Sequence, residues 1–93
     1  MFRPSDQRRV QAAFDAAIEA PYEVTITLED NRMTMRAQVM DPDNAAIPVV
    51  QAIWWYDPAG LKNRPQPSND EVARIAAEFN TACQAYTAAQ GGG

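Results

Sequence analysis

The chain has 93 residues, a net charge of −4 at pH 7, one cysteine and no histidine. This length supports a single domain with one hydrophobic core, and the missing histidine removes the commonest metal ligand and the usual proton shuttle at neutral pH. One cysteine excludes an internal disulfide framework, and no apolar run reaches the length of a membrane span. We therefore expect a soluble, cytoplasmic protein that makes no membrane contact.

The first predicted element is a helix from Ser5 to Ala20, which Pro21 ends. Ser5 is a candidate N-cap, and Asp6 lies in the first turn, where a negative charge interacts favourably with the helix dipole. The apolar residues recur at the spacing of one buried helical stripe, namely Val10, Ala13, Phe14, Ala17 and Ile18.

The apolar period then changes from 3.6 to two, which predicts a pair of antiparallel strands over 22–29 and 32–39. A two-residue turn at Asp30 and Asn31 would connect them, because Asn tolerates a positive φ. The resulting register pairs Leu28 with Met33, Ile26 with Met35, Val24 with Ala37 and Tyr22 with Val39 on one face, and Glu29 with Arg32, Thr27 with Thr34 and Thr25 with Arg36 on the other.

Residues 41–48 contain two prolines and predict a loop. Asp41 and Asp43 begin a string that is similar to the start of a calcium loop, but the required glycine and distal glutamate are missing, which favours a polar turn over a metal site. The run at 49–56 is rich in β-branched and aromatic residues and favours a third strand over a short helix. A proline-rich connecting loop follows at 57–69.

A last helix is predicted to start with Ser68 and Glu71 at capping-box spacing and to end near Gln90, before a flexible glycine tail at 91–93. Its apolar stripe comprises Val72, Ile75, Ala76, Phe79, Ala82, Cys83 and Tyr86. The pattern as a whole predicts one α+β domain over 1–90. Its expected form is a small antiparallel β-meander of two or three strands, with the N- and C-terminal helices on one face, in the order α-β-β-(β)-α.

The sequence lacks the residue combinations that common enzyme mechanisms need. Without histidine no Ser-His or Cys-His nucleophile pair can form, and the chain has no glycine-rich phosphate loop. Cys83 falls on an apolar helical stripe, with no Lys or Arg at helical spacing beside it, which is typical of a buried and unreactive thiol. We therefore expect no enzymatic activity, no catalytic or metal-binding residue and no cofactor.

Three of the eight aromatic residues are consecutive: Trp54, Trp55 and Tyr56. In a strand, Trp54 and Tyr56 share one face and Trp55 lies on the other, so a large aromatic side chain points away from the helices. It either is covered by the 57–69 loop or is exposed as an anchor for a protein partner. The candidate partner-binding residues are Trp54, Trp55, Tyr56, Arg32, Arg36, Glu29, Asp30, Lys62 and Arg64.

These features favour a non-enzymatic protein-binding module that binds a larger protein or complex, including a nucleic-acid-binding one. The chain is similar in size, charge and simplicity of fold to phage and mobile-element inhibitors, including anti-CRISPR proteins. This resemblance implies stoichiometric binding that occludes a functional surface of a host complex. Two alternatives stay open: a structural or assembly protein that forms homo-oligomers through the aromatic residues or an open strand edge, and a single-strand nucleic-acid binder, which the acidic charge disfavours.

Overall fold

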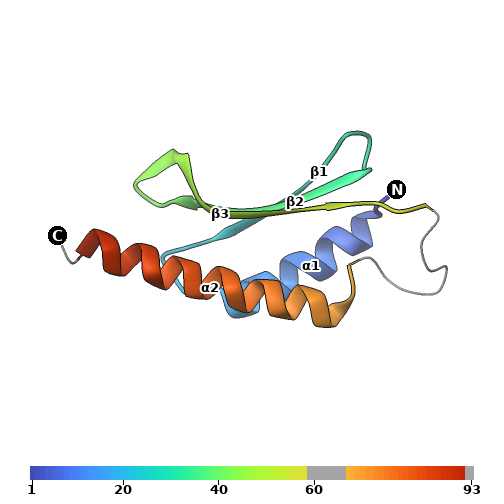
Figure 1. The fold of residues 1–93 in the computed structure, drawn as a ribbon. Helices are drawn as coiled ribbons and strands as arrows, with labels where there is room; N and C mark the ends of the chain where they lie inside the picture. The colour runs from blue at the N-terminus through green and yellow to red at the C-terminus, as the bar shows by residue number, and fades with distance from the viewer. Residues whose placement is uncertain (59–66, 92–93) are drawn as a thin grey trace.

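The computed structural model describes residues 1–58 and 67–91, and it has the predicted α+β order with a third strand (Figure 1). The elements are α1 (Pro4–Ala17), β1 (Val24–Glu29), β2 (Thr34–Asp41), β3 (Asn44–Trp55) and α2 (Asn69–Gly91). The three strands form one antiparallel sheet in the order β1-β2-β3. The meander is therefore confirmed in its three-stranded form.

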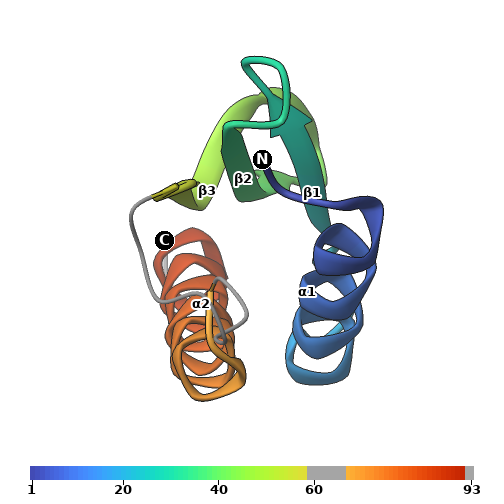
Figure 2. The ribbon, with the colours of Figure 1, turned by 90° about the vertical axis from the view of Figure 1, so that its right-hand side faces the viewer.

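Both helices pack on the same face of the sheet, with α1 beneath β1 and α2 beneath β3 (Figure 2). The buried core lies between these two layers, and the predicted stripes of the helices and the inner face of the hairpin supply most of it. Its members are Phe2, Val10, Phe14, Val24, Ile26, Met35, Ala37, Val39, Val72, Ala76, Phe79 and Cys83. The opposite face of the sheet has no helix over it in the described part of the chain.

Phe14 of α1 occupies the centre of this core and is fully buried. Its ring contacts Phe79 of α2 edge-on at a centroid distance of 4.9 Å and Trp54 of β3 at 6.2 Å. The helices are also joined at the end of α1, where the Glu19 N–H donates to Asn80 Oδ1 at 3.2 Å. One aromatic residue thus connects both helices to the sheet.

The start and end of the first helix differ from the sequence prediction. Helix α1 begins at Pro4, with Arg3 as the N-cap residue, and Ser5 is not the cap. The Asp6 carboxylate reaches back to accept a hydrogen bond from the Arg3 N–H at 2.8 Å, and proline at the first helical position costs no hydrogen bond. The helix ends at Ala17 rather than at Ala20.

The β1–β2 turn is longer than predicted, and the predicted register is wrong by two residues. Val24 pairs with Val39, Ile26 with Ala37 and Leu28 with Met35. Asp30, Asn31 and Arg32 all have positive φ, of 52°, 55° and 65°, and the Met33 N–H donates to the Asp30 carbonyl at 3.0 Å. The turn therefore spans four residues, 30–33. Because a shift of two keeps every side chain on its predicted face, the core residues are unchanged.

The predicted loop at 41–48 is mostly strand. Strand β2 continues to Asp41 and β3 begins at Asn44, so the connection is only two residues long. The pairing there is irregular, with register shifts on both sides of Met40, and Pro48 lies opposite Met40. A bulge on an edge strand tolerates a proline, whose missing N–H would otherwise interrupt the ladder. Residues 49–55 are strand as predicted, and Tyr56 follows the strand's last residue.

The last helix begins as the sequence predicts, because the Ser68 hydroxyl accepts a hydrogen bond from the Glu71 N–H at 3.2 Å. Asp70 and Glu71 place negative charge in its first turn. The helix includes Gly91, the first residue of the predicted glycine tail, so it extends one residue beyond the predicted domain. Of the other residues predicted to be loop or tail, 59–66 and 92–93 lie outside the described residues.

Candidate functional site

The three consecutive aromatic residues divide between the two faces of the sheet as their alternation predicts. Trp54 packs against Phe14 in the core, and the Tyr56 ring meets Phe2 edge-on at 5.5 Å. Trp55 points the other way, and 69% of its surface is exposed. Trp54 and Tyr56 therefore pack against the core and are partly buried, whereas Trp55 is the large aromatic that faces solvent.

Trp55 belongs to a surface that we call the outer sheet face. Its side chains alternate with those of the core along each strand, and the register places them side by side. Its members are Thr25, Thr27 and Glu29 from β1, Thr34, Arg36 and Gln38 from β2, and Gln51, Ile53 and Trp55 from β3. Trp55 lies opposite Thr34, of which only 9% is exposed, and Ile53 lies opposite Arg36.

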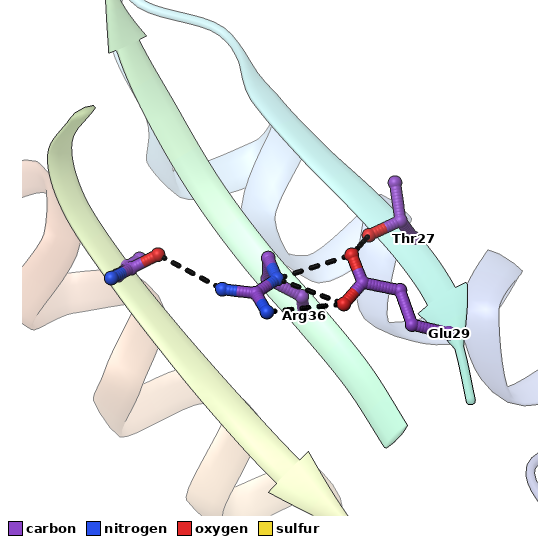
Figure 3. Close-up of polar contacts among 4 residues, drawn as sticks. Thr27, Glu29 and Arg36 are labelled. Carbon is purple, nitrogen blue, oxygen red and sulfur yellow. Dashed lines mark hydrogen bonds and ion pairs between the residues drawn. The ribbon is translucent and has the colours of Figure 1, made fainter. Parts of the chain in front are cut away.

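A row of polar side chains crosses the outer sheet face from β1 to β3 (Figure 3). The Arg36 Nε donates to both Glu29 carboxylate oxygens at 3.1 Å, and its Nη1 donates to Gln51 Oε1 at 3.2 Å. The Thr27 hydroxyl donates to Glu29 Oε2 at 3.2 Å. The guanidinium is thus held in one position by partners on both neighbouring strands, before any other molecule binds.

The ion pair sets the electrostatics of this face. The hydrogen bond from Arg36 holds the pKa of Glu29 below its ordinary value, so the carboxylate is ionised at neutral pH. Arg36 is the only cation on the outer sheet face among the described residues, and Glu29 neutralises it. The face therefore offers an indole ring beside a fixed, neutralised polar row, rather than a positively charged surface.

The remaining predicted contact residues do not all join this face. Asp30 and Arg32 are exposed in the four-residue turn at one end of the sheet. The Arg32 carbonyl there accepts a hydrogen bond from the Phe2 N–H at 2.7 Å. Lys62 and Arg64 lie outside the described residues. The structure thus brings together Glu29, Arg36 and Trp55 from the predicted set.

The predicted contact residues do not include Gln51, Ile53 or Thr27, although the alternation along the strands places them on the same face as Trp55 or Glu29. The signal for Gln51 and Ile53 is present in the sequence, because they precede Trp55 by four and two residues and share its face in any regular strand. Thr27 is two residues before Glu29 by the same rule. The direct bond from Arg36 to Gln51 depends on the β2–β3 register, which the sequence does not specify.

The aspartates of the β2–β3 turn form a structural hydrogen-bond network. Asp41 accepts hydrogen bonds from the Tyr86 hydroxyl of α2 and from the Asp43 N–H. These bonds hold the pKa of Asp41 below its ordinary value, and the bond to Asp41 raises the pKa of Tyr86. No group of three or more potential metal ligands occurs within 1–58 and 67–91. The network connects the end of β2 to the second half of α2.

Cys83 is the only thiol in the chain. It is buried on the inner side of α2, and desolvation raises the pKa of its thiol. A buried thiol with a raised pKa stays protonated at neutral pH and is a poor nucleophile. The local geometry therefore gives Cys83 a packing role.

Asp41→Asn is expected to weaken the pH dependence of stability. A carboxylate whose folded pKa is lowered stabilises the fold above its unfolded pKa, and this contribution disappears as pH falls through the folded pKa. The difference in unfolding free energy between wild type and Asp41→Asn should thus be largest near neutral pH and shrink below about pH 4. Urea titrations across this range measure it.

Tyr86→Phe is the matched variant, because it keeps the Asp41 carboxylate and removes its main donor. Its stability difference from wild type should shrink over the same pH range. Parallel pH profiles for all three proteins would contradict the role of this network.

Comparisons with protein-family models, curated proteins and solved structures found no match to this chain. Within the described residues, neither helix combines the length and the apolar character that crossing a membrane requires. The case for a function therefore comes from the outer sheet face itself.

Proposed function

We propose that this chain is a non-enzymatic protein-binding module that contacts a larger protein through the outer sheet face. The observation that carries the proposal is Trp55, a large aromatic side chain with 69% of its surface exposed on the sheet face away from the helices. Exposed tryptophans with polar neighbours are typical of the few residues that dominate binding energy at protein interfaces.

The fixed polar row beside Trp55 supports this proposal. Binding costs less free energy when the contacting side chains are already ordered, and Arg36 is held by Glu29 and Gln51 in the unbound chain. The best partner surface would have an apolar pocket for the indole and polar groups near the Arg36–Glu29 pair. The net charge of −4 favours partners with a basic surface, including nucleic-acid-binding complexes.

Crosslinking from position 55 tests the proposal directly. A photo-crosslinking amino acid with an aromatic side chain keeps a ring at position 55, and in place of Trp55 it should capture a defined partner in the cells that produce the chain. The same amino acid at Ala73, an exposed residue of α2, is the control and should not capture that partner. With the captured protein purified, Trp55→Ala should weaken binding on the order of 10- to 100-fold relative to wild type.

Two results would contradict protein binding through this face. One is equal capture from positions 55 and 73, and the other is equal affinity of wild type and Trp55→Ala for the partner. Titration of single-stranded oligonucleotides against the tryptophan fluorescence covers the nucleic-acid alternative, since such binding would weaken steeply with salt. The neutralisation of Arg36 by Glu29 disfavours that alternative.

A more specific form of the proposal is inhibition of a host defence complex. Its support is the resemblance in size and charge to phage and mobile-element inhibitors, together with a surface suited to occluding another protein. Cells that carry an active defence system should lose protection against phage when they express wild-type chain. Cells that express equal amounts of Trp55→Ala should keep it, and full inhibition by that variant would contradict this form of the proposal.

A further inference from the structure

The two edge strands of the sheet, β1 and β3, differ in whether their outward backbone groups have hydrogen-bond partners. Along β1, the Gln7 side chain donates to the Ile26 carbonyl at 2.8 Å and the Gln11 side chain donates to the Val24 carbonyl at 3.0 Å. Residues four apart on a helix rise by about 6 Å, close to the spacing of alternate residues in a strand. Two glutamines on α1 therefore occupy two consecutive outward carbonyls of β1, which hinders another strand from pairing there. We call this the sealed edge.

The outward backbone groups of β3 follow from the hydrogen-bond pattern. In an antiparallel pair, alternate residues direct both the N–H and the C=O toward the neighbouring strand. The Tyr56 N–H donates to the Met33 carbonyl at 2.8 Å, so every second residue counted back from Tyr56 bonds toward β2. The intervening Gln51, Ile53 and Trp55 direct their backbone groups outward. In the described part of the chain, no hydrogen bond reaches these groups.

Strand β3 also lacks the charged side chains that usually prevent an edge strand from pairing with another chain. It is 12 residues long and contains no Asp, Glu, Lys or Arg, whereas β1 and β2 each contain charged residues. Proline and bulges also block edge pairing, but in β3 they are confined to its first half, at Pro48 and at the register shifts opposite Met40 of β2. Residues 50–55 form a regular, uncharged edge segment.

We infer that two copies of the chain pair β3 with β3 in antiparallel orientation, forming a two-fold dimer with one continuous six-stranded sheet. The β3 edge can pair with an extended, uncharged segment whose outward N–H and C=O groups have the same spacing. The β3 strand of a second copy is such a segment. Pairing through β3 brings no like charges together within the strands, despite the net charge of −4. The α2 helices then approach each other, and their exposed residues include alanines at positions 73, 77, 85, 88 and 89.

The sealed β1 edge limits the assembly to two copies. After β3–β3 pairing, both outer edges of the six-stranded sheet are β1 strands, whose carbonyls Gln7 and Gln11 already occupy. A symmetric contact of one edge with itself closes after two copies. The inference is therefore a dimer, and not a filament.

A backbone-specific variant tests the pairing in the full chain. Gln51→Pro removes an outward N–H that has no partner in the described monomer, and prolines are tolerated on strand edges. Gln51→Ala is the control, because it loses the side-chain bond to Arg36 but keeps the N–H. In light scattering over a wide concentration range, wild type and Gln51→Ala should be dimers. Gln51→Pro loses one hydrogen bond in each copy, so its dimer dissociation constant should rise on the order of tenfold or more.

Ile53→Glu is a second variant should Gln51→Pro fail to fold, as circular dichroism would show. The new carboxylate lies opposite Arg36 within one chain but adds like charges along the paired edges. A monomeric wild type overturns the inference, even if β3 binds an extended segment of another protein. Folded Gln51→Pro or Ile53→Glu proteins that dimerise as tightly as wild type also overturn it.

The sealing role of the glutamines has its own variant. Gln7→Ala combined with Gln11→Ala should expose the β1 carbonyls and yield species larger than a dimer, whereas Arg8→Ala on the exposed side of α1 should stay dimeric. A double variant that remains strictly dimeric overturns the sealing argument. Trp55→Ala keeps every backbone group and adds no charge to the paired edge, so it should weaken dimerisation less than Gln51→Pro or Ile53→Glu does. Its effect on partner binding and the effect of Gln51→Pro on dimerisation can therefore fail independently.

Discussion

Phe14→Ala is expected to lower the free energy of unfolding by about 3–5 kcal/mol, the largest effect of any substitution considered for this chain. Phe14 is fully buried and contacts Phe79 and Trp54, so its removal leaves a cavity where both helices meet the sheet. Such a loss is a large part of the stability of a typical small domain. Urea denaturation followed by circular dichroism measures it.

The control for Phe14→Ala is Ala16→Ser, which changes an exposed residue of the same helix and should alter stability by no more than about 0.5 kcal/mol. If Phe14→Ala cost as little as this control, the aromatic cluster would not be the centre of the core, and the packing of α1 on α2 would have to be different.

The adjacent tryptophans should respond to alanine substitution in opposite ways. Trp54→Ala removes a ring that packs against Phe14 and should cost about 3 kcal/mol, the lower end of the range for large aromatic residues, because Trp54 is only partly buried. Trp55→Ala removes a mostly exposed side chain and should change stability by no more than about 0.5 kcal/mol.

Fluorescence separates the two tryptophans independently of stability. The Trp54→Ala protein retains only the exposed Trp55, so its folded state should emit at longer wavelength and be quenched more readily by iodide than the Trp55→Ala protein. Equal costs of the two substitutions, or equal quenching of the two variants, would contradict the assignment of faces on β3.

Periodicity predicted the parts of the fold that depend on burial. The stripes around Phe14 and Phe79 specify which side of each helix is buried, and the alternation around Ile26 specifies which side of the hairpin faces the core. For the third strand, the alternation puts Trp54 and Trp55 on opposite faces without deciding which of the two is buried. These signals arise because apolar side chains must be removed from water together, whatever the details of the connections. Fold class, element order and the division between Trp54 and Trp55 were predictable for this reason.

The turn geometry was not predictable in the same way. A hairpin with a two-residue turn and one with a four-residue turn place the same side chains on the same faces, so burial cannot distinguish them. What decides between them is the backbone of Asp30, Asn31 and Arg32, all with positive φ. Single-residue preferences identified only Asn31, because an arginine at positive φ is uncommon.

The sequence predicts which residues of the candidate site share a face of the sheet. It does not predict which of their side chains form hydrogen bonds with one another. Glu29, Arg36 and Trp55 were on the predicted set, but the predicted register gave Arg32 to Glu29 as its partner. In the structure the longer turn moves β2 by two residues along β1, so Thr34 lies opposite Glu29 and Arg36 lies opposite Thr27. The Arg36 side chain reaches Glu29 diagonally across the two strands. The hydrogen bond from the Gln7 side chain to the Ile26 carbonyl of β1 could not be predicted from the sequence either, since it depends on where α1 lies against the sheet.

The contact of Phe14 with Phe79 joins segments at opposite ends of the chain, 65 positions apart, and this has a kinetic consequence. During synthesis the first helix and all three strands are translated before any residue of α2. Their shared apolar surface stays uncovered until that last helix arrives. Contacts of large sequence separation also slow folding, because long loops must close before the contact is gained. The nascent chain is therefore vulnerable to aggregation until α2 has been translated and has left the ribosome.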